Sequence, residues 1–464
     1  MNRLSILLGL ASLGPALPAQ ATSATWIPRT TVPPVAIASG VVGHSLSHCL
    51  ATNRVTMFGG VKPGNLYSNG TFEWTGASWL DKTQPLGPSA RAYHAATSLF
   101  PKPGVLIHGG RATTVDSGTW EWNGTSWAQK ATGGPGPREL HALAYDPGRD
   151  RVVLFGGTAT TAGMGLADTW EWDGNAWSQK VPVTSPPARV GHAMAYDLAS
   201  GRVVMFGGIT SPSTTTSLAD TWEWDGVNWL QRTPVSSPQV RAYASMTYDL
   251  SRGGLVLHGG RSGSSGAPHA DAWTWDSAGN TWKALVPAGV PGPRRDLHGT
   301  AYDLARGRIV LFGGYVAYPT QIFYADTWEL ATAVPASVIG YGAGCPGTAG
   351  VPVLGAVGVP RLGSTTFALS LANARPTAPA GLLFAELPEN VAVGGGCTLL
   401  VSAPFLSVSL TTDAAGGASV PLPVPGATSL LGLELRLQGV VADPLGSLGG
   451  GACTTAGLLL VLGT

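Results

Sequence analysis

The sequence predicts an all-β fold: six copies of one four-stranded antiparallel unit, followed by a separate and smaller β domain. Three observations support this prediction. A double glycine recurs six times at intervals of 47 to 54 residues, and a Thr-Trp-Glu-Trp segment or a close variant follows each one. Charged residues make up only 11% of the chain, whereas glycine (65) and proline (36) are abundant, as in loop-rich β proteins. The double glycines are Gly59-Gly60, Gly109-Gly110, Gly156-Gly157, Gly207-Gly208, Gly259-Gly260 and Gly313-Gly314.

The third copy, Arg138 to Trp177 and beyond, shows how a unit divides into strands. Its four expected strands are residues 141–145, 151–155, 169–172 and 177–180. Dipeptides that tolerate the positive φ of a two-residue hairpin turn separate the last two strands of several copies. They are Asn123-Gly124, Asp173-Gly174 and Asp225-Gly226. Each unit is therefore expected to be an antiparallel meander.

The sixth copy stops at Leu330 and lacks its own fourth strand. A matching piece lies at the other end of the chain, where residues 26–29 and the prolines after them resemble residues 177–180 and their prolines. We expect residues 26–29 to pair with residues 327–330. This pairing would close the repeats into a ring and remove an open sheet edge.

A period near fifty residues with a double glycine and paired tryptophans resembles the kelch repeat. The resemblance covers about residues 26–330. It implies a six-bladed β-propeller over residues 22–334, similar to the central domain of galactose oxidase. It also implies that the first strand of each unit lines a central channel and that the fourth strand lies outermost.

The N-terminus has the pattern of a secretory signal peptide. Arg3 precedes an apolar run from Leu4 to Leu17, and Ala19-Gln20-Ala21 matches a signal-peptidase site. We expect residues 1–21 to be removed from a protein that is secreted, periplasmic or held at the cell surface. The alternative is a buried N-terminal strand or helix, which no periodicity supports. No later apolar run approaches the roughly 20 residues of a membrane helix, so the chain is not expected to span a membrane.

The repeat pattern ends after Ala333. No lysine follows Lys283, and residues 335–464 are rich in Gly, Leu, Val, Ala and Pro. We expect a second all-β domain there, a small sandwich. Its Gly- and Pro-rich segments, such as Tyr341–Gly347, resemble a C-terminal module of many secreted bacterial proteins, for which the resemblance implies no activity.

The four cysteines lie at positions 49, 345, 397 and 453. An exported chain permits disulfides, and four cysteines allow three pairings. We prefer a Cys345–Cys397 bond within the C-terminal domain. Cys49 and Cys453 would then be free or would link the two domains.

The charge and cysteine patterns exclude two classes of function. The net charge is +1 with no basic block, so the footprint of a nucleic-acid binder is missing. No Cys-x-x-Cys pair exists, so a structural zinc site has no support. We expect no metal and no cofactor.

Residues that recur in every unit are expected to be architectural. The paired tryptophans should pack between units, and the buried glutamates between them would need ionic partners, for which we expect the repeating arginines. In a second interpretation these arginines surround the mouth of the channel and face carboxylate ligands. The glutamates are Glu73, Glu121, Glu171, Glu223 and Glu329, and the arginines are Arg91, Arg138, Arg189, Arg241 and Arg295.

A histidine lies three residues after each of four of these arginines. An aspartate precedes most of the expected third strands. Hydrogen bonds to the neighbouring unit explain the histidines better than metal ligation does. The aspartates are expected to cap the loops behind them. These residues are His94, His141, His192 and His298, and Asp168, Asp220, Asp271 and Asp326.

Departures from the repeat are more informative about binding. Units two and five carry His108 and His258 before the double glycine and Arg111 and Arg261 after it. In a ring of six these units face each other. Unit six has an aromatic loop where other loops hold small residues, and loops on a rigid scaffold concentrate binding residues. Its aromatic residues are Tyr315, Tyr318, Phe323 and Tyr324.

Two classes of function fit the pattern. We favour a binding or interaction protein that recognises a protein or a glycan with its loop face, at Arg111, Arg261 and the residues around them. The alternative is an enzyme that acts on carbohydrate. Resemblance to galactose oxidase would require a copper site with a linked cysteine, but Cys49 lies at the end of an inner strand. A sialic acid mutarotase needs only acid–base groups and arginines, which the chain has.

Overall fold

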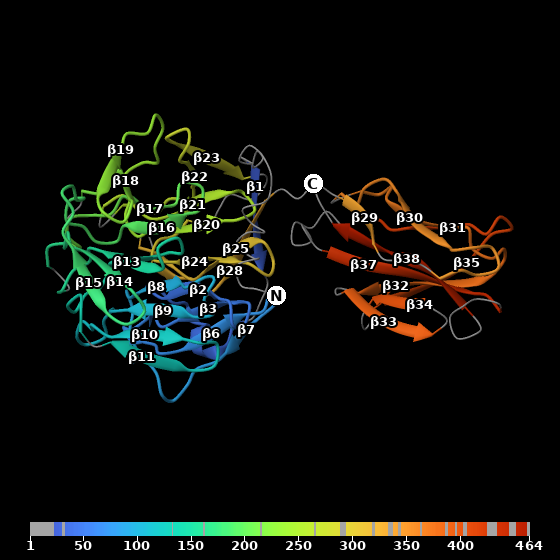
Figure 1. Ribbon diagram of the computed structural model, residues 1–464, viewed down its shortest axis with the longest axis horizontal. Coiled ribbons are helices and arrows are strands. Elements are labelled where there is room, and N and C mark those ends of the chain that lie inside the picture. Colours follow the sequence, from blue (N-terminus) through green and yellow to red (C-terminus); the bar gives the residue numbers. More distant parts are fainter. Residues whose placement is uncertain are drawn as a thin grey trace. The chain divides into compact units, whose positions relative to one another are not determined.

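The computed structural model divides the chain into two compact units, Met1–Thr332 and Ala333–Thr464 (Figure 1). It describes residues 23–461 except residues 30–32, 132, 161–162, 214–215, 264–265, 288–293, 318–320, 333–336, 342–344, 362–363, 386–387, 395–396, 402–405, 425–433 and 445–451. The predicted signal peptide, residues 1–21, lies outside the described residues.

The first unit contains six groups of four antiparallel strands among its described residues, which we name sheets 1 to 6. Sheet 1 consists of β2 (Ser45–Cys49), β3 (Arg54–Phe58), β6 (Thr71–Trp74) and β7 (Trp79–Asp81). Sheet 2 consists of β8 (Ala95–Ser98), β9 (Val105–His108), β10 (Thr119–Trp122) and β11 (Trp127–Ala131). Sheet 3 consists of β12 (Ala142–Asp146), β13 (Arg151–Phe155), β14 (Thr169–Trp172) and β15 (Trp177–Lys180).

Sheet 4 consists of β16 (Ala193–Asp197), β17 (Arg202–Phe206), β18 (Thr221–Trp224) and β19 (Trp229–Arg232). Sheet 5 consists of β20 (Ser245–Asp249), β21 (Gly254–His258), β22 (Ala272–Asp276) and β23 (Thr281–Pro287). Sheet 6 consists of β24 (Gly299–Asp303), β25 (Arg308–Phe312), β28 (Thr327–Thr332) and β1 (Ser23–Arg29). Loops carry the 3-10 turn η1 (Val35–Ile37) and two short hairpins, β4 (Val61–Lys62) with β5 (Leu66–Tyr67) and β26 (Tyr315–Val316) with β27 (Ile322–Phe323).

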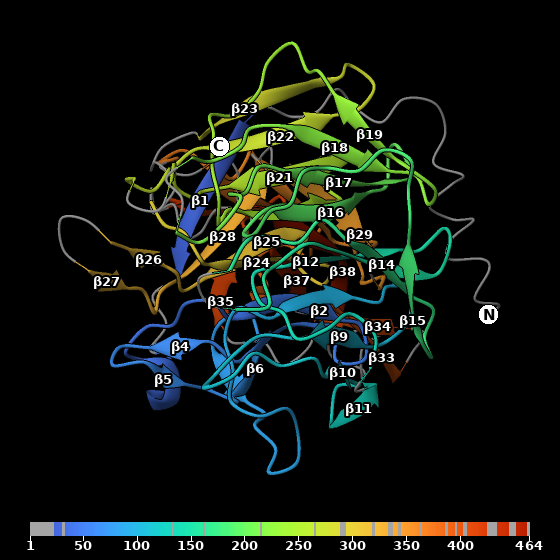
Figure 2. The ribbon, with the colours of Figure 1, turned by 90° about the vertical axis from the view of Figure 1, so that its left-hand side faces the viewer.

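First strands lie toward the middle of this unit, and fourth strands such as β11, β15, β19 and β23 lie at its periphery (Figure 2). Each first strand contacts the first strand of the next sheet, and β2 of sheet 1 also contacts β24 of sheet 6. Second strands such as β13 are buried on both faces, which explains why they read as unbroken apolar runs.

The double glycine that ends each second strand has no room for a side chain. In sheet 3, Gly156 and Gly157 have φ values of 64° and 91°. A Cβ atom on Gly156 would lie 2.7 Å from the carbonyl oxygen of Arg189, and one on Gly157 would lie 2.7 Å from Cβ of His141. Positive φ and close backbone approach both favour glycine here.

Tryptophans join five of the six pairs of neighbouring sheets by hydrogen bonds, whereas between sheets 5 and 6 Trp26 packs on the ring of His258. The tryptophan at or beside the start of a fourth strand donates its indole N–H to the threonine that begins the third strand of the preceding sheet. This 2.9 Å bond joins Trp127 to Thr71, Trp177 to Thr119, Trp229 to Thr169, Trp282 to Thr221 and, between sheets 1 and 6, Trp79 to Thr327. Of the paired third-strand tryptophans that were predicted to be architectural, Trp122, Trp172 and Trp224 are buried against these fourth-strand tryptophans at ring distances of 5.4 to 5.5 Å.

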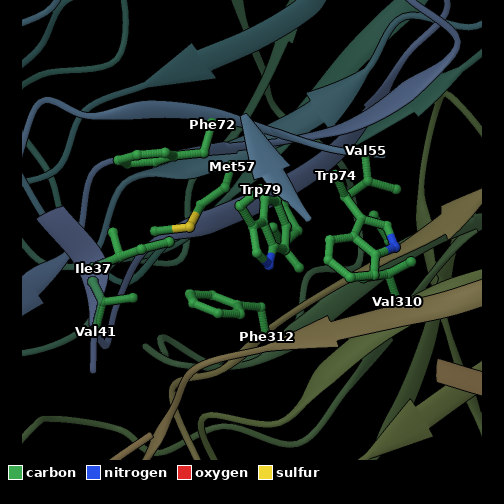
Figure 3. Close-up of a cluster of buried hydrophobic side chains, with 11 residues drawn as sticks. Ile37, Val41, Val55, Met57, Phe72, Trp74, Trp79, Val310 and Phe312 are labelled. Carbon is green, nitrogen blue, oxygen red and sulfur yellow. The ribbon is translucent and has the colours of Figure 1, made fainter. Parts of the chain in front are cut away.

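Sheets 1 and 6 share an apolar core (Figure 3). Met57, Trp74 and Trp79 of sheet 1 lie against Val310 and Phe312 of sheet 6. The rings of Trp79 and Phe312 are 5.0 Å apart, and Trp74 donates its indole N–H to the Glu329 carboxylate at 3.2 Å.

The N-terminal strand β1 pairs with β28 over the residues that the sequence predicted, but it is not the outermost strand, because it lies between β28 and β23. In the antiparallel pair of β1 and β28, Trp26 lies opposite Leu330 and Arg29 opposite Thr327. The start of β1 also pairs in parallel with β23, which joins sheets 5 and 6 through Ser23 and Val286. The sequence pattern did not predict this second pairing.

The second unit is also built of strands. One sheet contains β29 (Ser337–Tyr341), β38 (Ala452–Val461), β37 (Glu434–Ala442), β32 (Pro379–Ala385) and β35 (Leu406–Thr411). Another contains β30 (Val353–Val357), β31 (Ala368–Ala372) and β36 (Ala418–Pro421), and β33 (Pro388–Gly394) pairs with β34 (Cys397–Val401). The five-stranded and three-stranded sheets share one apolar core, to which Leu369, Phe384 and Leu437 contribute.

Cys49 and Cys453 are buried free thiols, so they do not link the two units. The expected Cys345–Cys397 bond stays a prediction, because the side chain of Cys397 is not described. Within the described residues, no helix has the length and apolar character needed to cross a membrane.

Candidate functional site

Six residues, one from each sheet, form a closed ring of backbone hydrogen bonds. The N–H of each donates to the carbonyl oxygen of its counterpart in the preceding sheet, at N···O distances of 2.7 to 3.1 Å. The bond from Gly43 of sheet 1 to Leu297 of sheet 6 completes the ring. The members are Gly43, Tyr93, Leu140, Gly191, Tyr243 and Leu297, with φ values between 53° and 62°. Tyrosine and leucine rarely adopt this left-handed conformation, and such residues cluster at functional sites.

The residue after each ring member is a histidine in five sheets and Ala244 in sheet 5, and these residues line a cavity of about 150 Å³. Each histidine packs on the aromatic ring before the double glycine of the preceding sheet, as His192 does on Phe155 at 5.6 Å. Burial lowers the pKa of His44 to about 4 and that of His94 and His192 to about 3. The imidazoles are therefore neutral near pH 7 and contribute to packing.

A second cavity has a volume of about 190 Å³. Four ring residues that line the first cavity also line this one. We name it the axial pocket. Its lining consists of Tyr93, Leu140, Tyr243 and Leu297 of the ring, together with Arg111, Glu139, Pro212 and Arg261. Three of these eight side chains are charged, and two are aromatic.

Arg111 and Arg261 are the cations of the axial pocket. The guanidinium carbon of Arg111 lies 5.1 Å from the centre of the Tyr93 ring, and that of Arg261 lies 5.0 Å from the Tyr243 ring. Their side chains are 26% and 14% exposed. The tyrosine faces hold both cations by cation–π contact while part of each remains accessible.

Two buried carboxylates lie behind these arginines. Nε of Arg111 is 2.8 Å from Glu139, and Nη1 of Arg261 is 3.5 Å from Asp296. Burial raises the pKa of Glu139, and it raises the pKa of Asp296 to about 6, although the neighbouring arginines act in the opposite direction. Asp296 is therefore poised to gain a proton in mildly acidic solution.

Sequence reasoning missed these two carboxylates, although a signal was present. The residue before the ring member is Val or Ala in sheets 1, 2, 4 and 5, and acidic only at Glu139 and Asp296. A charge at a position that is otherwise apolar marks a functional candidate, because an ionised group is costly to bury there.

A family model described as the KLHDC2/KLHL20/DRC7 Kelch-repeats domain matches residues 148–334, which include all of sheets 4 and 5. This match and the repeated four-stranded antiparallel sheets support a kelch β-propeller. No curated protein matches the chain.

The repeating arginines of the propeller are buried ion-pair residues, but their predicted partner was wrong. Each holds the aspartate before the third strand through two hydrogen bonds of 2.7 to 3.2 Å, and each also donates to the carbonyl of the first glycine in the double glycine. The pairs are Arg91–Asp116, Arg138–Asp168, Arg189–Asp220, Arg241–Asp271 and Arg295–Asp326. With residue exposures of 0 to 2%, these arginines are enclosed by protein and do not present a ring of free cations to a ligand.

The glutamates between the tryptophans pair with other cations, which extend from strand ends and turns. Arg54 contacts Glu73, Lys130 contacts Glu121, Arg149 and Lys180 contact Glu171, Arg202 and Arg232 contact Glu223, and Arg29 and Arg308 contact Glu329. The aspartates also do more than cap loops, because Asp168 accepts the indole N–H of Trp170 at 2.7 Å as well as the Arg138 pair.

The repeating histidines only partly follow the prediction of hydrogen bonds between units. His94 bonds Ser45 at 2.9 Å, and His298 bonds Ser245 at 2.8 Å. In the part of the chain that is described, His141 and His192 have no hydrogen-bond partner. No cluster of three or more His, Cys, Asp or Glu side chains suited to a metal ion occurs among the described residues.

The other described candidate residues from the sequence do not line the axial pocket. His108 and His258 are 0% and 2% exposed, occupy the positions that phenylalanine fills in other sheets, and line neither cavity. Tyr315 packs on Phe323, and Tyr324 stacks on the guanidinium of Arg295 at 4.2 Å. Tyr318 lies outside the described residues. Of the predicted ligand residues, the structure brings Arg111 and Arg261 together.

Proposed function

We propose that the chain is an exported binding protein, a six-bladed kelch propeller closed by its N-terminal strand, whose axial pocket binds an anionic group of a protein or glycan ligand. The closed hydrogen-bond ring and the Trp79–Thr327 bond between sheets 1 and 6 support the six-bladed closure. The signal-peptide pattern of residues 1–21 supports export, and N-terminal sequencing of the mature protein should begin at Thr22.

The observation that carries this proposal is the convergence of Arg111 and Arg261 on one cavity. They come from sheets 2 and 5, far apart in the chain, and both remain partly exposed beside tyrosine rings. Guanidinium groups on a rigid scaffold are suited to fork-like hydrogen bonds with carboxylates. Kelch domains mediate protein interactions, and a partner that presents an acidic group fits this pocket.

Binding assays on the mature chain test the proposal. The probes are an array of acidic and neutral glycans and a library of acidic peptides, followed by titration calorimetry of the best ligand. The double variant Arg111→Ala/Glu139→Gln removes one cation without leaving a buried carboxylate unpaired. It should weaken binding by about 1.5 to 3 kcal/mol for each charge-assisted bond lost.

A matched control removes a positive charge from sheet 2, at the end of β9 opposite to Arg111. Lys102 lies in the turn between β8 and β9, and its side chain is 46% exposed. Lys102→Ala should leave the affinity unchanged. Equal losses in both variants would show that the loss of affinity is not specific to the pocket, and unaltered binding in the Arg111 variant would refute the proposed site.

A second candidate function, a carbohydrate epimerase similar to sialic acid mutarotases, is favoured by the position of Glu139. Its carboxyl group lines the axial pocket beside Arg111, and burial raises its pKa. A carboxyl group of this kind is suited to general acid–base catalysis. NMR exchange spectroscopy of acidic sugar anomers, with Glu139→Gln as the comparison, would detect such an activity.

A further inference from the structure

The six repeats are of three kinds, and each kind occurs twice, three repeats apart. The residues around the ring read Val-Gly-His at 42–44 and 190–192, Ala-Tyr at 92–93 and 242–243, and acid-Leu-His at 139–141 and 296–298. The residue after the double glycine also matches between sheets three repeats apart, in two of the three pairs. It is Val61 in sheet 1 and Ile209 in sheet 4, and it is arginine in sheets 2 and 5.

Three steps around a ring of six lead to the opposite side. The order of the backbone hydrogen bonds therefore places Tyr93 opposite Tyr243 and Leu140 opposite Leu297. The two ring glycines, Gly43 and Gly191, leave room for the rings of Tyr93 and Tyr243 in the same way. A Cβ atom on Gly43 would lie 2.6 Å from Cδ1 of Tyr93, and one on Gly191 would lie 2.7 Å from Cδ1 of Tyr243. The ring thus has approximate two-fold symmetry in its contacts as well as in its sequence.

This symmetry gives the charged part of the pocket two half-sites with the same kinds of residue, although Glu139 lines the cavity and Asp296 does not. Each contains an arginine, a tyrosine whose face the guanidinium covers, and a buried acid from the next sheet. In both half-sites the acid is at most 2% exposed, whereas the arginine is partly accessible. A ligand would therefore meet two cations, one on each side of the axis, with the acids behind them.

We infer that the axial pocket takes a ligand with two anionic groups, such as a dicarboxylate, one for each half-site. This inference rests on the proposed function. Each guanidinium can donate a fork of hydrogen bonds to one carboxylate, and a single carboxylate would leave the second arginine unused. Because the cavity of about 190 Å³ is smaller than pockets that enclose whole drug-sized ligands, the two groups must be joined by a short linker.

Calorimetry with linear dicarboxylates from succinate to suberate, each compared with the monocarboxylate of equal length, tests the inference. One length should bind with a stoichiometry of one and about ten- to a hundredfold more tightly than its monocarboxylate, because the second contact is intramolecular. The double variants Arg111→Ala/Glu139→Gln and Arg261→Ala/Asp296→Asn should lose this advantage to a similar extent. Lys102→Ala should keep it.

Three results would overturn the inference. If each dicarboxylate binds no more tightly than its monocarboxylate, the pocket takes one anion, and the proposed binding function stands without the second half-site. If one double variant loses binding and the other retains it, the half-sites are not equivalent. If neither the dicarboxylates nor the monocarboxylates bind to protein whose melting temperature shows it to be folded, the proposal that this pocket binds anions is refuted.

Discussion

The wholly buried guanidinium group of Arg189 holds the carboxylate of Asp220 through two hydrogen bonds of 2.7 Å each. The same arginine donates to the carbonyl of Gly207 at 2.9 Å, and its own carbonyl accepts the N–H of Gly157 from the preceding sheet. One residue therefore ties the loop before the third strand and the double glycine together through its side chain, and holds the neighbouring sheet through its main-chain carbonyl. Because the pattern recurs in five sheets, it is part of the repeat rather than a local feature.

Replacing Arg189 by alanine should unfold the propeller more easily without touching the axial pocket. The substitution leaves Asp220 and the Gly207 carbonyl without their partner, and breaking a buried ion pair costs about 3 to 5 kcal/mol. Chemical denaturation measures this loss. Arg202→Ala is the control, because that arginine is 32% exposed and lies 3.9 Å from Glu223, so it should cost no more than about 1 kcal/mol. Equal losses of unfolding free energy in the two variants would show that the buried ion pair stabilises the fold no more than the exposed one does.

Acid should weaken the propeller through the same aspartates. Burial alone would raise the pKa of Asp271, but hydrogen bonds and the charge of Arg241 outweigh burial and lower it to about 2. A depressed pKa contributes stability above the usual value of 3.8, and this stability is lost as the pH falls toward 2. The free energy of unfolding, measured from pH 5 to pH 2, should fall less steeply in Asp271→Asn than in the wild type. Parallel curves would contradict the assignment.

Asp296 should affect the pH dependence of stability in the opposite direction from Asp271. Burial raises its pKa to about 6 in spite of Arg261, so its contribution to stability is present below pH 3.8 and is lost as the pH rises through 6. The difference in unfolding free energy between Asp296→Asn and the wild type should therefore shift in favour of the variant between pH 4 and pH 7. Protonation also leaves Arg261 unopposed, so anionic ligands should bind the wild type more tightly at pH 5 than at pH 7. A constant difference in stability would show that Asp296 ionises normally.

Deleting residues 22–35 should cause aggregation. The deletion removes β1 and exposes the edge of β28, and an unpaired edge is a template for association. A chain that ends at residue 334 should instead remain soluble, because residues 335–464 share no repeat with the propeller. Soluble yield and near-ultraviolet circular dichroism of the two truncations decide this. Similar behaviour of both would mean that either the closing strand or the domain boundary is misplaced.

The strands of the third repeat follow from local sequence alone. In sheet 3, the second, third and fourth strands have the predicted bounds, and the first is shifted by one residue. The pairing of residues 26–29 with residues 327–330 was also predictable, because a missing fourth strand at one end of the chain matched an extra one at the other. These features depend on hydrophobic period, turn residues and repeat counting, all of which are visible in one dimension.

The choice of ionic partners was decided only in the tertiary structure. Arg189 and the glutamates of the third strands were plausible partners by charge, yet the fold brings Asp220 to the arginine and sends Glu223 to Arg202 and Arg232. The axial pocket shows the same limit. Arg111 was recognisable as a departure from the repeat, but its carboxylate, Glu139, belongs to the next sheet. Sequence spacing determined the blades, whereas the contacts between blades depend on how they pack around the ring, and that packing created the pocket.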